Sequence, residues 1–315
     1  MAELFTFGES MVSFAPVQEN VLRYVREYQR FIAGSESNVA IGVSKLGISA
    51  EWLSRLGKDE FGVAVYQKIR AEGVVCEHLI FDKDAYTGVM FKETLGDETN
   101  VFYYRKDSAA SRMMPDDLDQ VDLRGTKMIY CTGITPVLSE SCMKTMVKIY
   151  DIARKDKIPV AFDPNIRRKL WAGKDYCTIM KKFALASQIL LTGLEEGKVL
   201  FGVDTVEEMI HKVFDDGKVR YLVIKDGANG AWITDGNKRL KVRPYPCRPV
   251  DTVGAGDGFN AGFLAGILRH RDMETAGHMG AICGALATMT KGDYEGYPDA
   301  DKMQRILENT QEISR

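Results

Sequence analysis

Short apolar runs alternate with longer amphipathic runs along most of the chain. The short runs, which are rich in β-branched and aromatic residues, predict strands at 4–8, 50–55, 128–132, 159–163, 189–191 and 221–225. Apolar residues at helical spacing predict helices between these strands, among them 36–46, 60–71 and 139–155. Strands that alternate with helices of this length indicate an α/β fold with a mostly parallel sheet covered on both faces.

Two segments, 9–33 and 85–106, interrupt this alternation with patterns typical of exposed strands. Side chains along a strand point alternately to its two faces, which places Val101, Tyr103 and Arg105 together on one face. We interpret the two segments as a small β-sheet lid over the edge of the main sheet, within a single domain that spans the chain. The alternative is a pair of ordinary surface hairpins.

Composition narrows the class of protein. The chain has 315 residues, is 45% hydrophobic, and carries 42 Lys and Arg against 44 Asp and Glu, for a net charge of −2. The apolar content argues against disorder, and the lack of a basic excess argues against nucleic-acid binding. No stretch is apolar enough to span a membrane, and no signal-peptide pattern opens the sequence. Six scattered cysteines without a CxxC pair favour a reducing, cytoplasmic setting.

The strongest motif is DTVGAGDGFNAGFLAG at 251–266. Gly254, Ala255 and Gly256 form a small-residue turn that leads into a predicted helix, and Asp257 falls in the first turn of that helix. Such a helix start presents free backbone N–H groups, which suit an anion such as a phosphate. The alternative is a tight glycine turn with an acid that merely favours the helix dipole. GxxxxGK[ST] is absent, and Phe259 stands where a dinucleotide fingerprint needs its third glycine.

This motif resembles the C-terminal signature of the ribokinase-like sugar kinases, the phosphofructokinase-B type. Further matches follow in the order of the family: AGSESNVAIGVSKLG (33–47), SRLGKDEFG (54–62), DPN (163–165) and KDGANGAW (225–232). The resemblance covers essentially the full length. It implies a ribokinase-like three-layer α/β/α fold with a small β-sheet lid.

The resemblance also implies ATP-dependent phosphorylation of a sugar hydroxyl. Asp257 would be the base, and the backbone N–H groups of 254–257 would form an anion hole for the transferred phosphoryl group. The family's cofactor-binding positions fall on Asn165, Lys225, Gly227, Gly230, Gly254 and Gly256. The first part of a helix predicted at 278–293 would lie beside the adenine.

A magnesium contact is implied at Glu196, directly or through water, although Gly193 replaces an asparagine that is common in the family. The alternative is that Glu196 is simply an acid in the first turn of a helix. Some relatives also hold a monovalent cation near the position of Asp251, so such a cation is a further expectation.

Two arginines bear on the choice of sugar. Arg105 and Arg167 lie in YYRKDSAAS (103–111) and DPNIRRKLW (163–171), which resemble 2-keto-3-deoxygluconate kinases of this family. A guanidinium group binds a carboxylate through a planar fork, as a sugar acid requires. The resemblance places the following residues at the substrate: Gly34, Asn38, Tyr103, Arg105, Ile134, Arg167 and Asp251. Without it, an isolated arginine is better explained as an exposed salt-bridging residue.

We therefore predict an ATP-dependent kinase of 2-dehydro-3-deoxy-D-gluconate that forms the 6-phosphate. The alternatives are a fructokinase or 5-dehydro-2-deoxygluconokinase, a nucleoside kinase, or a sugar-binding relative without activity. A small lid sheet exposes strand edges and an apolar face. We expect two lids to pair in a homodimer or higher homo-oligomer.

Overall fold

The computed structural model describes residues 2–96, 98–171 and 173–313. In these ranges eight strands form the main sheet, in the order β14-β13-β12-β11-β10-β9-β1-β4. Their bounds are β14 (Arg239–Val242), β13 (Ala231–Thr234), β12 (Tyr221–Lys225), β11 (Ile189–Gly193), β10 (Val160–Asp163), β9 (Met128–Thr132), β1 (Leu4–Phe7) and β4 (Ala50–Leu53). In this spatial order the six strands from β12 to β4 are parallel to one another, whereas β13 pairs antiparallel with both β12 and β14. The predicted mostly parallel sheet is therefore confirmed.

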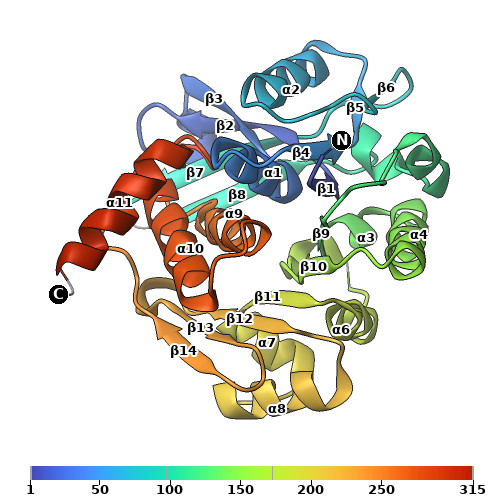
Figure 1. The fold of residues 1–315 in the computed structure, drawn as a ribbon. Coiled ribbons are helices and arrows are strands. Elements are labelled where there is room, and N and C mark those ends of the chain that lie inside the picture. Colours follow the sequence, from blue (N-terminus) through green and yellow to red (C-terminus); the bar gives the residue numbers. More distant parts are fainter. Residues whose placement is uncertain (1, 97, 172, 314–315) are drawn as a thin grey trace.

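Helices cover both faces of this sheet, as Figure 1 shows. One face carries α1 (Ser35–Lys45), α2 (Glu60–Ala71), α9 (Ala255–Leu268), α10 (Met273–Ala287) and α11 (Ala300–Ile313). The other carries α3 (Thr135–Leu138), α4 (Glu140–Asp156), α5 (Arg168–Trp171), α6 (Cys177–Ala186), α7 (Leu194–Phe201) and α8 (Val206–Asp216). A separate apolar core lies under each helical layer. The three-layer α/β/α fold is therefore confirmed.

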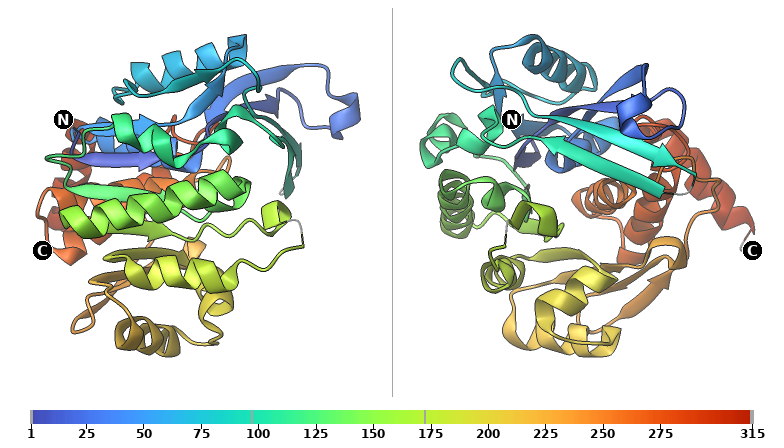
Figure 2. Two further views of the ribbon diagram at one scale, coloured as in Figure 1. Left: turned by 90° about the vertical axis from the view of Figure 1, so that its right-hand side faces the viewer. Right: turned by 180° about the vertical axis from the view of Figure 1, so that it is seen from behind.

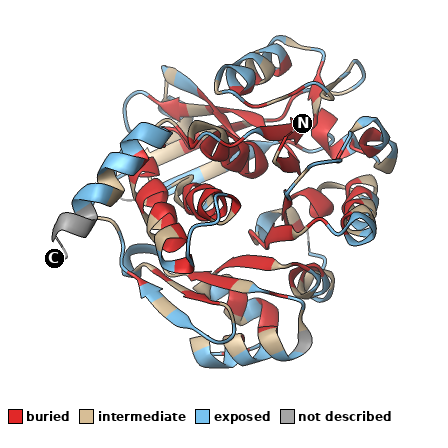
Figure 3. Ribbon diagram, viewed as in Figure 1, coloured by how far each residue is buried: buried red, intermediate tan, exposed pale blue. Residues whose placement is uncertain are grey.

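Helix α9 lies at the centre of its layer and is buried along almost its whole length (Figure 3). Its sequence is apolar on every side, which is typical of a helix enclosed by protein. Glycines allow α10 to approach closely: a Cβ at Gly262 would lie 2.3 Å from the carbonyl oxygen of Met279. This packing holds the amino end of α9 in a fixed position at the edge of the sheet.

The lid is a second sheet of four strands among the described residues, in the order β3-β2-β7-β8. The bounds are β2 (Met11–Pro16), β3 (Tyr28–Ala33), β7 (Val89–Leu95) and β8 (Glu98–Tyr104). The strands gather beside one end of the main sheet, as the left view of Figure 2 shows. Their alternation puts Met90 and Tyr103 toward the main domain, while Phe91 and Tyr104 pack together on the outer face.

Smaller elements complete the fold. Strands β5 (Arg55–Gly57) and β6 (Ile80–Asp82) form a short parallel pair, so the strand expected at 50–55 is divided between two sheets. Short 3₁₀ turns lie at Leu22–Tyr24, Ala109–Arg112, Pro115–Gln120 and Gly227–Asn229. Within the described ranges, no helix combines the length and apolarity that crossing a bilayer requires.

One predicted helix is displaced along the chain: α10 begins at Met273, before the predicted start at 278. The pattern at 278–293 predicts a helix, but α10 ends at Ala287 and the chain then turns. The turn brings Asp293 back beside Gly254, where its carbonyl oxygen would lie 2.2 Å from a Cβ on that glycine. The predicted end of the helix was wrong because the segment after Ala287 forms turns, in which Gly292 adopts a left-handed conformation with a φ of +90°.

Candidate active site

Two cavities meet at the amino end of α9, where the strands of the main sheet present their carboxyl ends. Open α/β sheets bind ligands at this edge. The first cavity has a volume of about 80 Å³, and its lining includes these predicted residues: Gly34, Asn38, Tyr103, Arg105, Ile134, Arg167, Gly254 and Asp257. The second has a volume of about 360 Å³, and its lining includes Lys225, Gly227, Gly230, Ala255 and Gly256. The remaining predicted residues, Asn165, Glu196 and Asp251, line neither cavity.

Asp257 lies in the first turn of α9, at the wall of the first cavity. Its Oδ1 accepts a hydrogen bond from Ser35 Oγ at 2.6 Å, and its Oδ2 accepts one from Asn38 Nδ2 at 2.9 Å. Burial raises the pKa of Asp257 to about 7, against the two hydrogen bonds, which lower it. A carboxyl group that is half ionised near neutral pH is suited to take a proton from a bound hydroxyl group.

The turn before Asp257 depends on glycine at position 254. Gly254 caps α9 with a φ of +85°, a conformation that L side chains rarely adopt. A Cβ there would also lie 2.2 Å from the carbonyl oxygen of Asp293, so the space is closed to a side chain. The first N–H groups of a helix have no partner within it. Gly254 and Asp257 line the first cavity, and Ala255 and Gly256 line the second, so the start of α9 forms part of the wall of both.

A buried network of hydrogen-bonded side chains joins β12, β10 and α9 beside this turn. Lys225 Nζ donates to Asp163 Oδ2 at 2.7 Å and to Asn260 Oδ1 at 3.0 Å. Asn260 Nδ2 donates in turn to Asp163 Oδ2 at 2.6 Å and to the Tyr130 hydroxyl oxygen at 3.1 Å. Because a Cβ at Gly256 would lie 3.7 Å from Lys225 Nζ, the ammonium group lies directly beside the turn at 254–256.

Asn165 is linked to Asp257 through a serine. It follows β10 with a φ of +38°, and its Nδ2 donates to Ser35 Oγ at 2.9 Å. Ser35 Oγ donates onward to Asp257. Asn165 is therefore two hydrogen bonds away from the Asp257 carboxylate, and it is not among the residues that line either cavity.

Glu196 holds backbone at the start of α7. Its Oε2 accepts from Gly193 N at 3.0 Å, and its Oε1 accepts from Ile166 N at 2.7 Å. Burial raises the pKa of Glu196, and the nearby Asp163 carboxylate raises it further. The two carboxylates share the positive charge of Lys225, so negative charge is in excess at this point. That charge balance fits a magnesium ion that arrives with phosphate groups and needs few protein ligands.

The two predicted arginines both reach the first cavity, but they differ in their partners. Arg105 is buried, and its Nε donates to Glu9 Oε2 at 2.6 Å. The other oxygen of Glu9 accepts from Ser108 Oγ at 2.6 Å. Arg167 is exposed, and within the described residues no acidic side chain forms an ion pair with it. Arg167 is therefore the cavity's arginine with a guanidinium group available to a ligand.

Asp251 also has an unexpected partner. Its Oδ1 accepts from Val253 N at 3.0 Å, and its Oδ2 accepts from Lys92 Nζ of the lid at 2.9 Å. Its carboxylate is thus occupied by the chain itself. Across the residues that the structure describes, no group of three or more His, Cys, Asp and Glu side chains is arranged to hold a metal ion.

Several residues of this region were not singled out from the sequence. These are Glu9, Ser35, Asp163, Asn260 and Asp293. Glu9 and Asp163 lie at the carboxyl ends of β1 and β10, so the rule for ligand sites in parallel sheets could have found them. Ser35, Asn260 and Asp293 lie on helices or a turn without such a signal.

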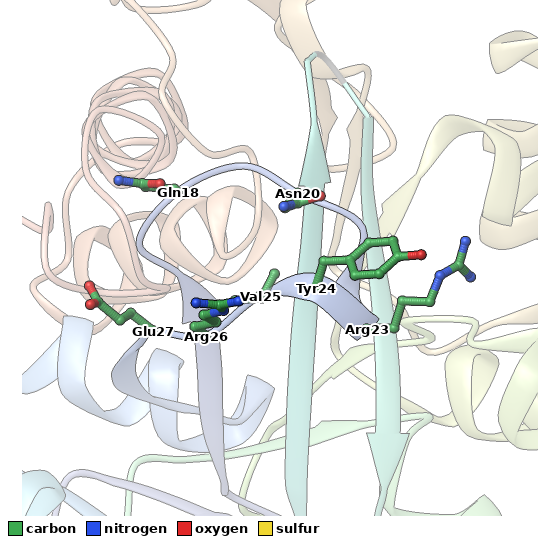
Figure 4. Close-up of a pocket in the computed structure, with 7 residues that line it drawn as sticks. All are labelled: Gln18, Asn20, Arg23, Tyr24, Val25, Arg26 and Glu27. Atoms are coloured by element: carbon green, nitrogen blue, oxygen red, sulfur yellow. The ribbon is translucent and has the colours of Figure 1, made fainter.

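A further hollow lies at the tip of the lid, in the loop between β2 and β3, and has a volume of about 590 Å³. Figure 4 shows its side chains spread around this loop: Gln18, Asn20, Arg23, Tyr24, Val25, Arg26 and Glu27. These side chains are exposed or half-buried, and Arg23 stacks over the Tyr24 ring. The hollow lacks the buried polar groups that distinguish the two cavities at α9.

The fold and the paired cavities suit an enzyme that holds two small molecules side by side. Residues 1–300 match the family described as pfkB family carbohydrate kinase. The chain is 32% identical over 308 residues to 2-dehydro-3-deoxygluconokinase of Bacillus subtilis, covering 96% of this chain and 94% of the relative. It is 30% identical over 309 residues to 2-dehydro-3-deoxygalactonokinase of Haloferax volcanii, covering 97% and 96%. The chain belongs to the pfkB family of carbohydrate kinases.

Solved structures agree with this assignment. A PfkB protein from Polaromonas has a TM-score of 0.87 at 31% identity, covering 96% of this chain and 99% of that one. A putative ribokinase II of E. coli, solved with ATP and Mg²⁺, has a TM-score of 0.91 at 22% identity, covering 98% and 100%. A fructokinase double mutant from Vibrio cholerae, solved with fructose, ADP and potassium, has a TM-score of 0.84 at 24% identity, covering 98% of each chain. The last two establish the likeness of fold.

Proposed function

We propose that this protein transfers the γ-phosphoryl group of ATP to the 6-hydroxyl of 2-dehydro-3-deoxy-D-gluconate. One observation carries the choice of a sugar acid: Arg167 lines the cavity that contains Asp257 and has no ion-pair partner among the described residues. An arginine binds a carboxylate through two parallel hydrogen bonds, which orients the ligand as well as holding it. The names of the relatives from Bacillus subtilis and Haloferax volcanii support the same substrate class.

The reaction uses Asp257 and the turn beside it. The hydroxyl oxygen at C6 attacks the γ-phosphorus, a new O–P bond forms, and the bond from phosphorus to the β,γ-bridging oxygen breaks. The hydroxyl proton passes to Asp257, whose pKa of about 7 leaves it largely able to accept a proton above neutral pH. Backbone N–H groups at 254–257 stabilise the charge on the transferred group.

ATP is proposed to occupy the second cavity, with its phosphates at the turn and its adenine among apolar side chains. The cavity wall is formed mainly by loop residues around Tyr245 and by the face of α10 at Ala281 and Gly284. Lys225 and Gly256 lie at the end nearest Asp257, where the phosphates would be. A bound Mg²⁺ would neutralise phosphate charge there, and Glu196 would hold it through water.

The sugar acid is proposed to lie in the first cavity, with its hydroxyl groups at Gly34 and Asn38 and its carboxylate at Arg167. Tyr103 covers it from the lid, and Ile134 lies alongside. Arg105 contributes through its pair with Glu9, which leaves only part of its guanidinium group for the ligand. Closure of the lid excludes water, which otherwise competes as phosphoryl acceptor.

The test compares Arg167→Ala with Arg168→Ala, a neighbouring exposed arginine that lies outside the cavity lining. A charge-assisted hydrogen bond contributes about 1.5–3 kcal/mol, so Arg167→Ala should lower kcat/KM for the sugar acid by about 10- to 100-fold. Turnover of neutral fructose, and both activities of Arg168→Ala, should change by less than about threefold. An unchanged preference for the acid in Arg167→Ala would show that Arg167 does not bind the carboxylate.

A fructokinase or 5-dehydro-2-deoxygluconokinase activity is the second candidate. The buried pair of Arg105 with Glu9 favours it, because one of the two predicted arginines is already neutralised. Relatives with these names match over nearly the full chain at 26–28% identity. The same acceptor comparison separates the candidates, since a fructokinase would lose little with Arg167→Ala.

We also propose that two copies pair through the outer faces of their lids, in the cytoplasm. The outer face carries a stacked aromatic group, Phe14 against Phe91, with Tyr28 and Tyr104 packed at their edges. Phe14, Tyr28 and Phe91 are half-buried, and Phe14 also contacts Phe61 of α2. Tyr104 is 64% exposed and Phe102 is 42% exposed. Exposed aromatic side chains gathered on one sheet face are typical of a surface that a partner covers.

A further inference from the structure

A lysine of the lid reaches into the catalytic half of the protein. Lys92 lies on β7, on the inward face that also presents Met90, and its side chain is 2% exposed. Its Nζ donates to Asp251 Oδ2 at 2.9 Å and to Asp293 Oδ1 at 3.5 Å. A side chain of the lid sheet thus joins two acids of the main domain, one in the loop before α9 and one in the turn after α10.

Both acids are tied to the proposed catalytic turn. Asp251 accepts from Val253 N at 3.0 Å, which fixes the residue before Gly254. The backbone of Asp293 closes over Gly254, and its Oδ2 accepts from Asn38 Nδ2 at 3.2 Å. The same amide group of Asn38 donates to Asp257. The ammonium group of Lys92 therefore binds two acids that hold the turn from opposite sides, and this turn would form the anion hole.

The carboxylates of Asp251 and Asp293 require a positive charge beside them. Asp293 is 5% exposed, and burial raises its pKa, which Lys92 partly offsets. Burial acts to lower the pKa of Lys92, but Asp293 and Asp251 together raise it above its ordinary value. The lysine therefore stays charged and compensates two carboxylates. Removing one partner of such a buried group leaves the remaining charge uncompensated, which is strongly unfavourable.

The monovalent cation expected near Asp251 does not fit these residues, because the ammonium group of Lys92 already lies between the two carboxylates. We propose that Lys92 is a built-in replacement for such a cation, and that it acts as a positioning residue that couples the lid to the catalytic turn. The protein then needs no potassium for the order of residues 251–257. The turn is complete only when β7 of the lid is in place.

The test uses three variants whose sizes and charges differ in a controlled way. Lys92→Ala removes the charge and opens space for a small cation, Lys92→Met removes the charge but fills the space, and Lys92→Arg retains the charge. Each is measured with potassium, ammonium or methylammonium chloride, at an ionic strength held constant with tetramethylammonium chloride. Tetramethylammonium is too large to enter the space left by the side chain.

Thermal unfolding is the first readout, because it does not depend on the identity of the sugar. The midpoint of wild type and of Lys92→Met should be the same in potassium as in tetramethylammonium. The midpoint of Lys92→Ala should rise by at least about 2 °C in potassium or ammonium, because an ion that binds only the folded state stabilises it. A potassium-dependent rise of that size in wild type would overturn the proposal, even if no variant could be purified.

Turnover is the second readout and rests on the proposed kinase function. With the acceptor that gives the highest turnover, the kcat of the wild-type protein should differ by less than twofold with and without potassium. Lys92→Ala should lose at least about tenfold in kcat and regain most of it in potassium or ammonium, while Lys92→Met stays low and Lys92→Arg retains more activity than either. The proposal would be overturned if the kcat of Lys92→Ala without potassium were within twofold of the wild-type value. It would also be overturned if potassium or ammonium restored the kcat of Lys92→Ala no more than that of Lys92→Met. If no acceptor is turned over, the proposed function fails while the unfolding data still decide the role of Lys92.

Discussion

The ionisation of Asp257 leads to a quantitative prediction about activity and pH. Burial raises the pKa of this carboxyl group from 3.8 to about 7. Only the ionised form accepts the hydroxyl proton, so about half of the free enzyme is competent at pH 7, about one tenth at pH 6 and about one hundredth at pH 5. The value of kcat/KM should therefore fall about tenfold for each pH unit below neutrality.

The assay measures kcat/KM for the sugar acid from pH 5 to 9 in wild type and in Asp257→Asn. The terminal phosphate of ATP also titrates, with a pKa of about 6, so it contributes to the profile. The asparagine variant supplies the control, because its residual activity keeps the titration of ATP and lacks that of residue 257. We expect the kcat/KM of the variant at pH 8 to be lower than that of wild type by a factor of about 10²–10⁴. The plot of kcat/KM against pH should bend near pH 7 in wild type only. A bend of equal size in both proteins would refute the assignment of Asp257.

Stability gives an independent check with a definite sign. A carboxyl group whose pKa is raised by folding contributes stability that is fully present below its unfolded value of about 3.8 and is lost as pH rises through about 7. Asp257→Asn carries no such charge. The melting temperature of the variant relative to wild type should therefore increase between pH 5 and pH 8. A constant difference over this range would mean that the raised pKa does not exist.

The remaining predictions concern the turn, the serine beside it and the lid. Gly254→Ala forces a side chain into a left-handed conformation and against the backbone of Asp293, so kcat should fall at least tenfold while the protein loses about 1–3 kcal/mol of stability in urea unfolding. If the variant kept the wild-type kcat, catalysis would not require the left-handed glycine conformation at position 254. Ser35→Ala removes a hydrogen bond that lowers the pKa of Asp257, so the bend in the pH profile should move to higher pH; a shift to lower pH would contradict this. Light scattering at micromolar concentration should give a mass above that of one 35.2 kDa chain, and Tyr104→Arg should lower it; a monomer mass for the parent would exclude pairing through the lid.

Much of the fold could be predicted from the sequence because local signals and the global pattern agree. The run at 128–132 forms β9 with the expected bounds, and α2 spans the expected 60–71. That helix begins after Asp59, whose Oδ1 accepts from Gly62 N at 2.7 Å, as a capping residue should. The strand expected at 50–55 divides because Arg55 belongs to β5, which pairs with β6, and such a pairing cannot be read from the local pattern.

The candidate site was predicted only where a residue's role follows from a motif. Asp257 and Asn38 come from motifs, and the structure brings both to one cavity. Lys92 was missed because a lysine in VMFKETL reads as an exposed residue, although its alternation with Met90 puts it on the inward face. Its two acids lie more than 150 residues away, and no local signal identifies such partners. The expected helix over 278–293 also concealed Asp293.

The most direct test of the account is the chemistry itself. The purified protein is supplied with ATP and Mg²⁺, and consumption of ATP is measured with 2-dehydro-3-deoxy-D-gluconate, its C4 epimer, fructose, ribose and adenosine in turn. The phosphorylated position is then identified by ³¹P–¹H correlation NMR. We expect a keto-deoxy sugar acid to have the highest kcat/KM and to carry its new phosphate on C6. A higher kcat/KM for fructose, ribose or adenosine, or a phosphate on another carbon, would contradict it.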